Sequence, residues 1–171
     1  TYPYDIANPS NNWTLNTNEK GILLEDYTGH KCTNCPAAAT IATQLEDDTS
    51  LGVIVVSVHA STDGSFQSTD DVEFTVDYQT DAGDAYVQEM PGFIGNPMGT
   101  INRNDGGYSN TNWYFSSNWA TGVNDEISQG NLDANIQLQY NYYPSTNGLF
   151  IHTETSVYNT LSGNYHLISY V

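Results

Sequence analysis

The feature that most constrains this chain is its pair of cysteines, Cys32 and Cys35, which are the only two among 171 residues and are separated by two residues. A disulfide between positions i and i+3 closes a very small loop, and a small loop removes little chain entropy from the unfolded state. Such a bond therefore contributes little stability. The spacing is more typical of a disulfide that opens and closes in a redox reaction, with a static surface disulfide and half of a metal site as the alternatives.

The residues on either side of the pair predict a junction between a strand and a helix. Residues 21–27 (GILLEDY) have an apolar centre of strand length, which Thr28 and Gly29 end. After the pair, apolar residues recur at helical spacing: Ala37, Ala38, Ile41, Ala42 and Leu45. Pro36 suits the first turn of that helix, where its missing N–H costs nothing. We expect Cys32 at or just before the helix N-terminus, where free amides and the helix dipole lower the pKa of a thiol.

In a redox pair of this kind the first thiol is usually the exposed nucleophile. We therefore expect Cys32 to be exposed and Cys35, inside the first helical turn, to be the shielded resolving thiol. A zinc site of four cysteines is excluded by their number, and no HxxxH-type spacing joins any of the four histidines. We expect no metal and no cofactor, and a copper or zinc carrier that uses both cysteines and a histidine is a weaker alternative.

The charge of the chain limits its partners. Twenty acidic residues stand against three basic ones, Lys20, Lys31 and Arg103, so the net charge is −17. Nucleic acid is excluded as a partner because phosphate neutralisation needs Lys and Arg, and direct docking to an anionic membrane surface is equally disfavoured. Adaptation to salt or cold would give the same acidic balance without a functional meaning.

The composition favours a location outside the cytoplasm. Charged residues make up only 13% of the chain, about half the usual fraction, so Asn, Thr, Ser, Gln and Tyr supply most of the polar surface. We expect an exported protein of the periplasm, the outer membrane surface or the cell exterior. No apolar stretch approaches the roughly 18 residues that span a membrane. The chain begins at Thr1 rather than Met, so we expect that a leader, with any lipid anchor, has been removed.

The order of the predicted elements indicates a mixed α/β sheet. Residues 1–20 form an irregular lead-in, and 21–131 form an α/β domain. Within that domain we expect a buried central strand at 52–59, a polar insertion at 61–79, a helix at 81–89, a strand at 98–102, a tight hairpin turn at 104–107 and a helix at 113–129.

The last part of the chain, 132–171, is predicted to be β-rich. It contains three strand candidates, 134–143, 149–158 and 164–171, which would form part of a β-sandwich. Three strands are too few to close a sandwich. The unpaired edge would therefore suit self-association, through these strands or through the N-terminal segment.

Three motifs resemble one known family. The sequences LLEDYTGHKCTNCPAA at 23–38, VVSVHA at 55–60 and GNPMGTINR at 95–103 are similar, in order, to those of the outer membrane protein 28-related lipoproteins of Bacteroidetes-type bacteria. The resemblance covers roughly residues 20–171 and implies a thioredoxin-like mixed sheet with flanking helices, followed by a β-rich region. It also implies that Pro97 is a cis-proline facing the dithiol. The dipeptide between the cysteines matches no well-characterised oxidoreductase, so the direction of electron flow does not carry over.

Three residues near the pair are candidates for supporting its chemistry. Lys31 adjoins Cys32 and would stabilise its thiolate, or it is a solvated loop lysine. His30 would shuttle a proton near neutral pH, or it is a packed or solvated loop residue. His59 ends the strand at 52–59. Because the carboxyl ends of strands line the crevice of open α/β sheets, His59 is expected near the dithiol or as a hydrogen-bonded strand-end histidine.

Several acidic residues and one arginine are further candidates. Glu25 or Asp26 could be a buried acid that deprotonates Cys35, although a surface position is the more common outcome for either. Arg103 lies six residues beyond the proline of the third motif, roughly 20 Å along a strand, so a direct role at the thiols is not expected. The acidic residues Asp63, Asp70 and Asp71 could bind calcium, but the EF-hand pattern is absent, and a solvated acidic loop is the favoured interpretation.

Two functions follow from these residues. The first is an exported thiol–disulfide oxidoreductase of thioredoxin fold that acts on protein thiols and disulfides, with Cys32, Cys35, Pro97, Lys31 and His59 at its site. The alternative is a cell-surface structural or adhesive subunit, of filament type, that keeps a static disulfide and exchanges strands through its β tail.

Overall fold

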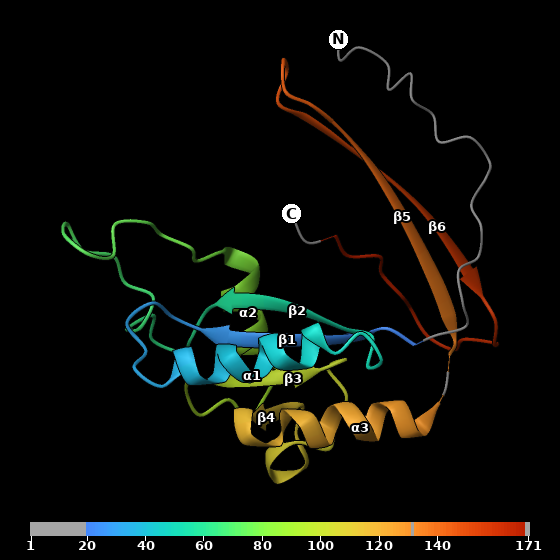
Figure 1. The fold of residues 1–171 in the computed structure, drawn as a ribbon, viewed down its shortest axis with the longest axis horizontal. Helices are drawn as coiled ribbons and strands as arrows, with labels where there is room; N and C mark the ends of the chain where they lie inside the picture. Colours follow the sequence, from blue (N-terminus) through green and yellow to red (C-terminus); the bar gives the residue numbers. More distant parts are fainter. Residues whose placement is uncertain (1–19, 131, 170–171) are drawn as a thin grey trace. The chain divides into compact units, whose positions relative to one another are not determined.

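The computed structural model describes residues 20–130 and 132–169, and the predicted lead-in lies outside them except for Lys20. The described chain forms two compact units (Figure 1). The first runs from Lys20 to Gly130, and the described part of the second is residues 132–169. Each unit has its own sheet, and the first contains both cysteines.

The first unit is built on a four-stranded mixed sheet. Its strands are β1 (Ile22–Thr28), β2 (Val53–His59), β3 (Met98–Ile101) and β4 (Trp113–Phe115), and their order across the sheet is β2-β1-β3-β4. β1 and β2 are parallel, and β3 and β4 each run antiparallel to the strand before them in that order. The predicted mixed α/β class is confirmed.

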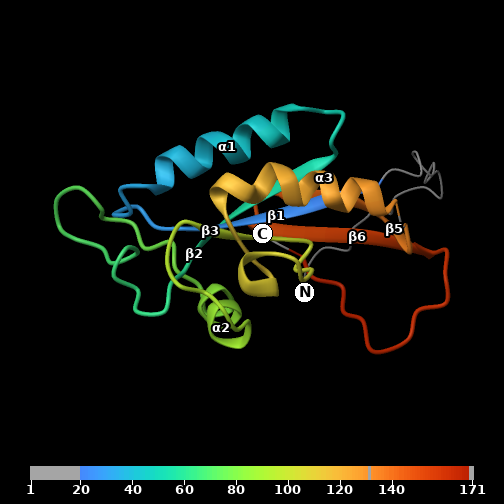
Figure 2. The same ribbon diagram turned by 90° about the horizontal axis from the view of Figure 1, so that it is seen from below.

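Helices cover both faces of this sheet (Figure 2). α1 (Cys35–Asp47) and α3 (Trp119–Gln129) lie on one face, and α2 (Asp81–Glu89) lies on the other. The α1/α3 face buries Ile22, Leu24, Ala38, Ala42, Leu45, Val53, Ile101, Trp119 and Val123. The α2 face buries Tyr27, Val58, Ala60, Val87, Met98 and Trp113. Because both faces of β1 are covered, almost the whole of that strand is buried.

Three local expectations in this unit are wrong. The strand at 52–59 was expected to be central and buried, but β2 lies at the edge of the sheet and only Val53 and Val58 in it are buried, because β1 alone among the described strands pairs with it. The helix predicted over 113–129 begins only at Trp119, because 113–115 form β4 and pair with β3 from Thr100↔Trp113 onward. A strand partner takes the backbone groups that a helix would have used. The connection between β3 and β4 is not a tight turn either, since it runs from Asn102 to Asn112 and contains a short 3₁₀ helix. The predicted helix at 81–89 is confirmed.

The second unit is a two-stranded antiparallel ribbon. β5 (Ala134–Tyr143) pairs with β6 (Gly148–Val157) along the full length of both strands. The third predicted strand, 164–171, is wrong over its described part, because 164–169 form no strand. A strand needs a neighbour for its backbone groups, and these residues have none in the described chain. The expected partial sandwich is therefore reduced to a ribbon. Among the described helices, none is both long and apolar enough to cross a membrane.

Candidate functional site

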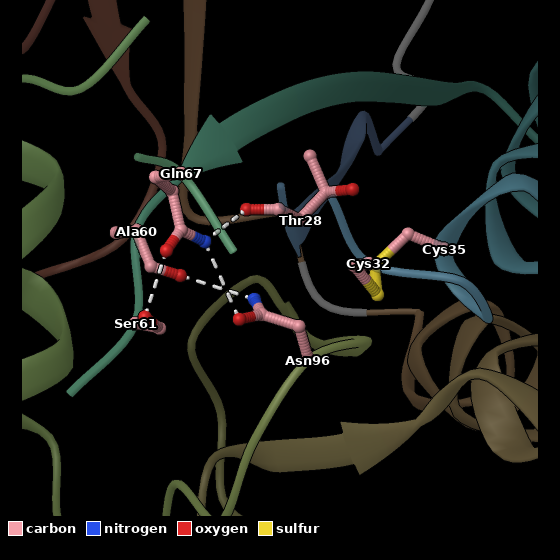
Figure 3. The surroundings of a disulfide bond; sticks show 7 residues. All are labelled: Thr28, Cys32, Cys35, Ala60, Ser61, Gln67 and Asn96. Atoms are coloured by element: carbon pink, nitrogen blue, oxygen red, sulfur yellow. Dashed lines mark hydrogen bonds between the residues drawn. A yellow bond between two sulfur atoms is a disulfide. The ribbon is translucent and has the colours of Figure 1, made fainter. Parts of the chain in front are cut away.

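The two cysteines form a disulfide where the chain passes from β1 to α1 (Figure 3). After β1 ends, the chain makes two consecutive turns: the Cys32 N–H donates to the Gly29 carbonyl at 3.0 Å, and the Cys35 N–H donates to the Cys32 carbonyl at 3.2 Å. α1 then begins at Cys35, with Pro36 in its first turn as predicted. The junction expected from the sequence is therefore present.

The expected difference in exposure between the two cysteines is wrong for this disulfide form. Cys32 is 5% exposed and Cys35 is 4% exposed. The bond joins the Cys32 sulfur to that of Cys35, the first residue of α1.

The start of α1 provides a favourable electrostatic environment for a thiolate. Its first turn carries no acidic side chain, and the Asn34 side chain makes no capping hydrogen bond to the backbone. The first amides of a helix have no partner within the helix, and they carry the positive end of the helix dipole. A thiolate at either cysteine would be stabilised by these amides, which lowers the pKa of a reduced thiol.

Asp26 is a buried acid on the α1 side of the sheet. It shares the parity of Ile22 and Leu24 along β1, so its side chain points to the face that α1 covers. It is 1% exposed, and its Oδ1 has no hydrogen-bond partner within the described chain. Burial raises the pKa of Asp26 from 3.8 to about 6. The surface position favoured from the sequence is wrong, and Asp26 is the candidate proton acceptor for Cys35.

Glu25 points to the opposite face and has a structural role. It is completely buried and accepts two hydrogen bonds from Arg103, at 2.7 Å from Nε and 2.6 Å from Nη2. Thr100 donates a third at 2.7 Å, and the Arg103 guanidinium lies 3.9 Å from the ring centroid of Tyr86 on α2. The surface position favoured for Glu25 is therefore wrong as well. Arg103 forms an ion pair with this carboxylate.

Lys31 and His30 make their contacts with the polar insertion at 61–79. The Lys31 ammonium lies 3.1 Å from the Ser68 hydroxyl and 3.6 Å from the Asp70 carboxylate. The His30 ring stacks on Phe74 with 4.7 Å between centroids, and its Nε2 lies 2.9 Å from the Ser68 carbonyl. The role of Lys31 at the thiolate stays a prediction.

His59 and Pro97 lie at the same edge of the sheet as the end of β1. His59 pairs with Thr28 in the parallel register, and its buried Nδ1 has no hydrogen-bond partner among the described residues. Burial, together with the nearby His30, lowers the pKa of His59. The Asn96–Pro97 peptide bond is cis, as the resemblance implies. Because Tyr27 pairs with Met98 in the antiparallel register, Pro97 follows at the level of Thr28.

Gln67, the most connected polar side chain at this edge, is a site residue that sequence reasoning missed. Gln67 is fully buried and hydrogen-bonds to residues near the ends of β1 and β2 and just before β3. The glycine at position 29 is the one indirect sign in the sequence that another segment packs closely here. A Cβ at Gly29 would lie 2.6 Å from the Phe66 carbonyl oxygen, so the insertion approaches this position more closely than any side chain allows.

The described residues contain no cluster of three or more His, Cys, Asp or Glu side chains that could hold a metal ion. The carboxylates of the proposed calcium loop serve as turn acceptors instead. Asp63 accepts the Ser65 amide, and Asp70 accepts the amides of 72–74 through one oxygen. These bonds hold the pKa of Asp70 well below its usual range. They support the solvated-loop interpretation.

Comparison with known proteins adds little. No protein-family model matches the chain, and no curated protein matches it. A crystal structure of an Agrobacterium tumefaciens protein from a structural genomics consortium aligns with a TM-score of 0.47 and 12% sequence identity. The alignment covers 74% of this chain, which spans only 54% of that protein. A likeness at this level indicates neither fold nor function.

Proposed function

We propose that the chain is a thiol–disulfide oxidoreductase of thioredoxin-like fold that uses Cys32 and Cys35. The observation that carries the proposal is the position of the disulfide, between the carboxyl end of the central strand β1 and the first turn of α1. The sheet order, with one parallel pair and two antiparallel strands, supports the fold assignment. The three motifs of the outer membrane protein 28-related family point in the same direction.

The reaction exchanges one disulfide for another. The Cys32 thiolate attacks a sulfur of the substrate disulfide, a Cys32–substrate disulfide forms, and the first substrate sulfur leaves as a thiolate that takes up a proton. Cys35 gives its proton to Asp26, and its thiolate then attacks the Cys32 sulfur and releases the second substrate thiolate. The substrate gains two electrons and the protein loses two, which leaves the Cys32–Cys35 disulfide seen here. Oxidation of a dithiol substrate is the same sequence in reverse.

The proposed location is outside the cytoplasm, where disulfides persist. The composition supports it, because few residues are charged and most of those are acidic. The proposed partners are protein thiols and disulfides. The reaction needs no further cofactor, because both sulfurs are provided by the chain.

The reduction potential of the Cys32–Cys35 pair tests this proposal. We expect a value between about −120 and −270 mV, the range of working oxidoreductases. The protein is equilibrated with glutathione or dithiothreitol buffers of known ratio, and its thiols are counted after acid quenching. The Cys32→Ser/Cys35→Ser variant is the blank. A potential below about −300 mV indicates an inert structural bond and contradicts the proposal.

The ribbon favours a second function, assembly with other copies of this chain. Its register places apolar side chains on one face: Ile136, Leu138, Tyr140, Tyr142, Leu149, Ile151 and Val157. The four on β5 are each more than half exposed. The opposite face of β5 carries Asn135, Gln137, Gln139 and Asn141, with Tyr143 at its end. Because an isolated two-stranded ribbon is only marginally stable in water, we propose that two ribbons cover each other's apolar faces in a surface subunit.

Replacing Leu138 by Glu on this face is expected to dissociate the assembly, because it places a charge among apolar side chains. Analytical ultracentrifugation at several concentrations should find the wild type at the mass of a dimer or larger and Leu138→Glu at the mass of one chain. Gln139→Glu, which adds the same charge to the polar face, is the matched control and should assemble. A monomeric wild type at all concentrations would argue strongly against this second function.

A further inference from the structure

The polar insertion is attached to the segment that leads into the cysteine pair. The Lys31 N–H donates to the Phe66 carbonyl at 3.0 Å, and the His30 Nε2 lies 2.9 Å from the Ser68 carbonyl. Between these two contacts lies Gln67, whose side chain points inward and is fully buried. Residues 66–68 therefore lie beside the segment that connects β1 to Cys32.

The Gln67 amide connects three separate parts of the fold (Figure 3). Its Nε2 donates to the Thr28 carbonyl at 2.6 Å and to the Asn96 Oδ1 at 3.4 Å. Its Oε1 accepts a hydrogen bond from the Ser61 hydroxyl at 2.8 Å. Asn96 in turn donates from Nδ2 to the Ala60 carbonyl at 3.0 Å. One side chain thus links the end of β1, the residues after β2 and the residue before Pro97.

A buried amide of this kind has a specific geometric effect. Its hydrogen bonds are directional, and leaving its partners without them inside the protein is costly. The Gln67 amide therefore adds a direct link between the Thr28 carbonyl and the Asn96 side chain, beside the pairing of Tyr27 with Met98. Without it, the segment before Pro97 would be held by the Asn96–Ala60 bond and, one residue beyond Pro97, by the pairing of β3 with β1.

We propose that Gln67 is a positioning residue for polypeptide substrates of the cysteine pair. It fixes the segment that contains Asn96 and Pro97 relative to the turn that contains Cys32. A polypeptide that brings its disulfide to Cys32 must contact the segments around that turn, whereas a small disulfide need not. The inference rests on the proposed oxidoreductase function and adds to it the substrate class and the residue that selects it.

The test compares two disulfide probes with the reduced protein. One probe is a pair of synthetic decapeptides joined by a single disulfide, and the other is hydroxyethyl disulfide. In Gln67→Met, which keeps the volume but removes the hydrogen bonds, kcat/KM for the peptide disulfide is expected to fall about tenfold, mainly through KM. The substitution removes three hydrogen bonds between neutral groups, and a tenfold effect lies within the net contribution of such bonds. The rate with hydroxyethyl disulfide and the reduction potential are expected to stay within about twofold of the wild type.

Two further variants serve as a matched control and as a second test of the Gln67 hydrogen bonds. Gln79→Met is the matched control, because Gln79 lies in the same insertion but its side chain donates only to Asp77 within the described chain; it should behave as wild type. Ser61→Ala removes one hydrogen bond to the Gln67 amide and keeps those to Thr28 and Asn96, and it also removes the bonds of the Ser61 hydroxyl with Gly64 and Asp63. It should lower the peptide rate in the same direction by about threefold, and it covers the case in which Gln67→Met does not fold.

The outcomes separate the inference from the function on which it rests. Equal loss with both probes, or no loss with either variant, overturns the positioning role while the wild type remains active. A wild-type protein that reduces neither probe overturns the oxidoreductase function itself, and the positioning role with it. A selective loss of peptide reduction in Gln67→Met and Ser61→Ala supports the proposal.

Discussion

Replacing Cys32 by Ser is expected to abolish disulfide exchange by this chain. The hydroxyl that replaces the thiol does not ionise near neutral pH and forms no disulfide, so neither the attack nor the mixed disulfide is possible. The measurement is the reduction of a peptide disulfide by the dithiothreitol-reduced protein. Retained activity in the Cys32→Ser variant would rule out the proposed mechanism.

Cys35→Ser provides the complementary result. Cys32 can still attack, but no thiol remains to release the product, so the variant should accumulate a covalent adduct with its substrate. Mass spectrometry without reducing agent would detect the adduct, and dithiothreitol would remove it. Because Cys35 begins α1 and is buried, each variant should be checked for folding by circular dichroism. If Cys35→Ser forms no adduct while Cys32→Ser is also inactive, a static disulfide becomes the better explanation.

The local features of the site could be predicted from the sequence. The strand ending at Thr28, the turn and the helix with Pro36 in its first turn are encoded by neighbouring residues. The helix predicted at 81–89 is also defined locally, since the structure shows that Thr80 caps α2 by accepting a hydrogen bond from the Gly83 amide. In each case the information lies within a few residues of the element.

The features that could not be predicted depend on distant residues. Polar side chains such as Glu25 and Asp26 are usually exposed, but β1 is covered on both faces by helices that come later in the chain. Trp113 joins the sheet because β3 offers it a partner, which overrides the helical spacing that follows. Gln67 lies in a polar loop, and only the folded chain brings it to Thr28 and Asn96.

Replacing Asp26 by Asn is expected to stabilise the protein at neutral pH. The folded-state pKa of about 6 lies above the usual 3.8, so the folded protein binds the proton more tightly than the unfolded chain. The stability contributed by the neutral acid is complete below pH 3.8 and is lost as the pH rises to about 6. The two pKa values differ by about 2 units, which corresponds to roughly 3 kcal/mol. The Asn side chain does not ionise and avoids this loss.

Urea denaturation of both proteins at pH 3.5 and pH 7.5 measures the effect. The advantage of Asp26→Asn over the wild type, as a free energy of unfolding, should grow by roughly 3 kcal/mol from the lower to the higher pH. All other carboxylates are common to the two chains, so their contributions cancel in the difference. An advantage that does not change with pH would mean that the Asp26 carboxylate is hydrated when it ionises, against its burial in the structure.

The same substitution separates the role of Asp26 in folding from its role in the reaction. The amide in Asp26→Asn cannot accept the Cys35 proton, so the second step should slow above pH 6, where wild-type Asp26 is ionised. The mixed disulfide on Cys32 should then accumulate transiently, while the rate of its formation stays unchanged. Rapid quenching followed by mass analysis resolves the two steps. If the variant gains stability but resolves the mixed disulfide at the wild-type rate, another group accepts the proton, and Asp26 is only a buried acid that lowers the stability of the fold at neutral pH.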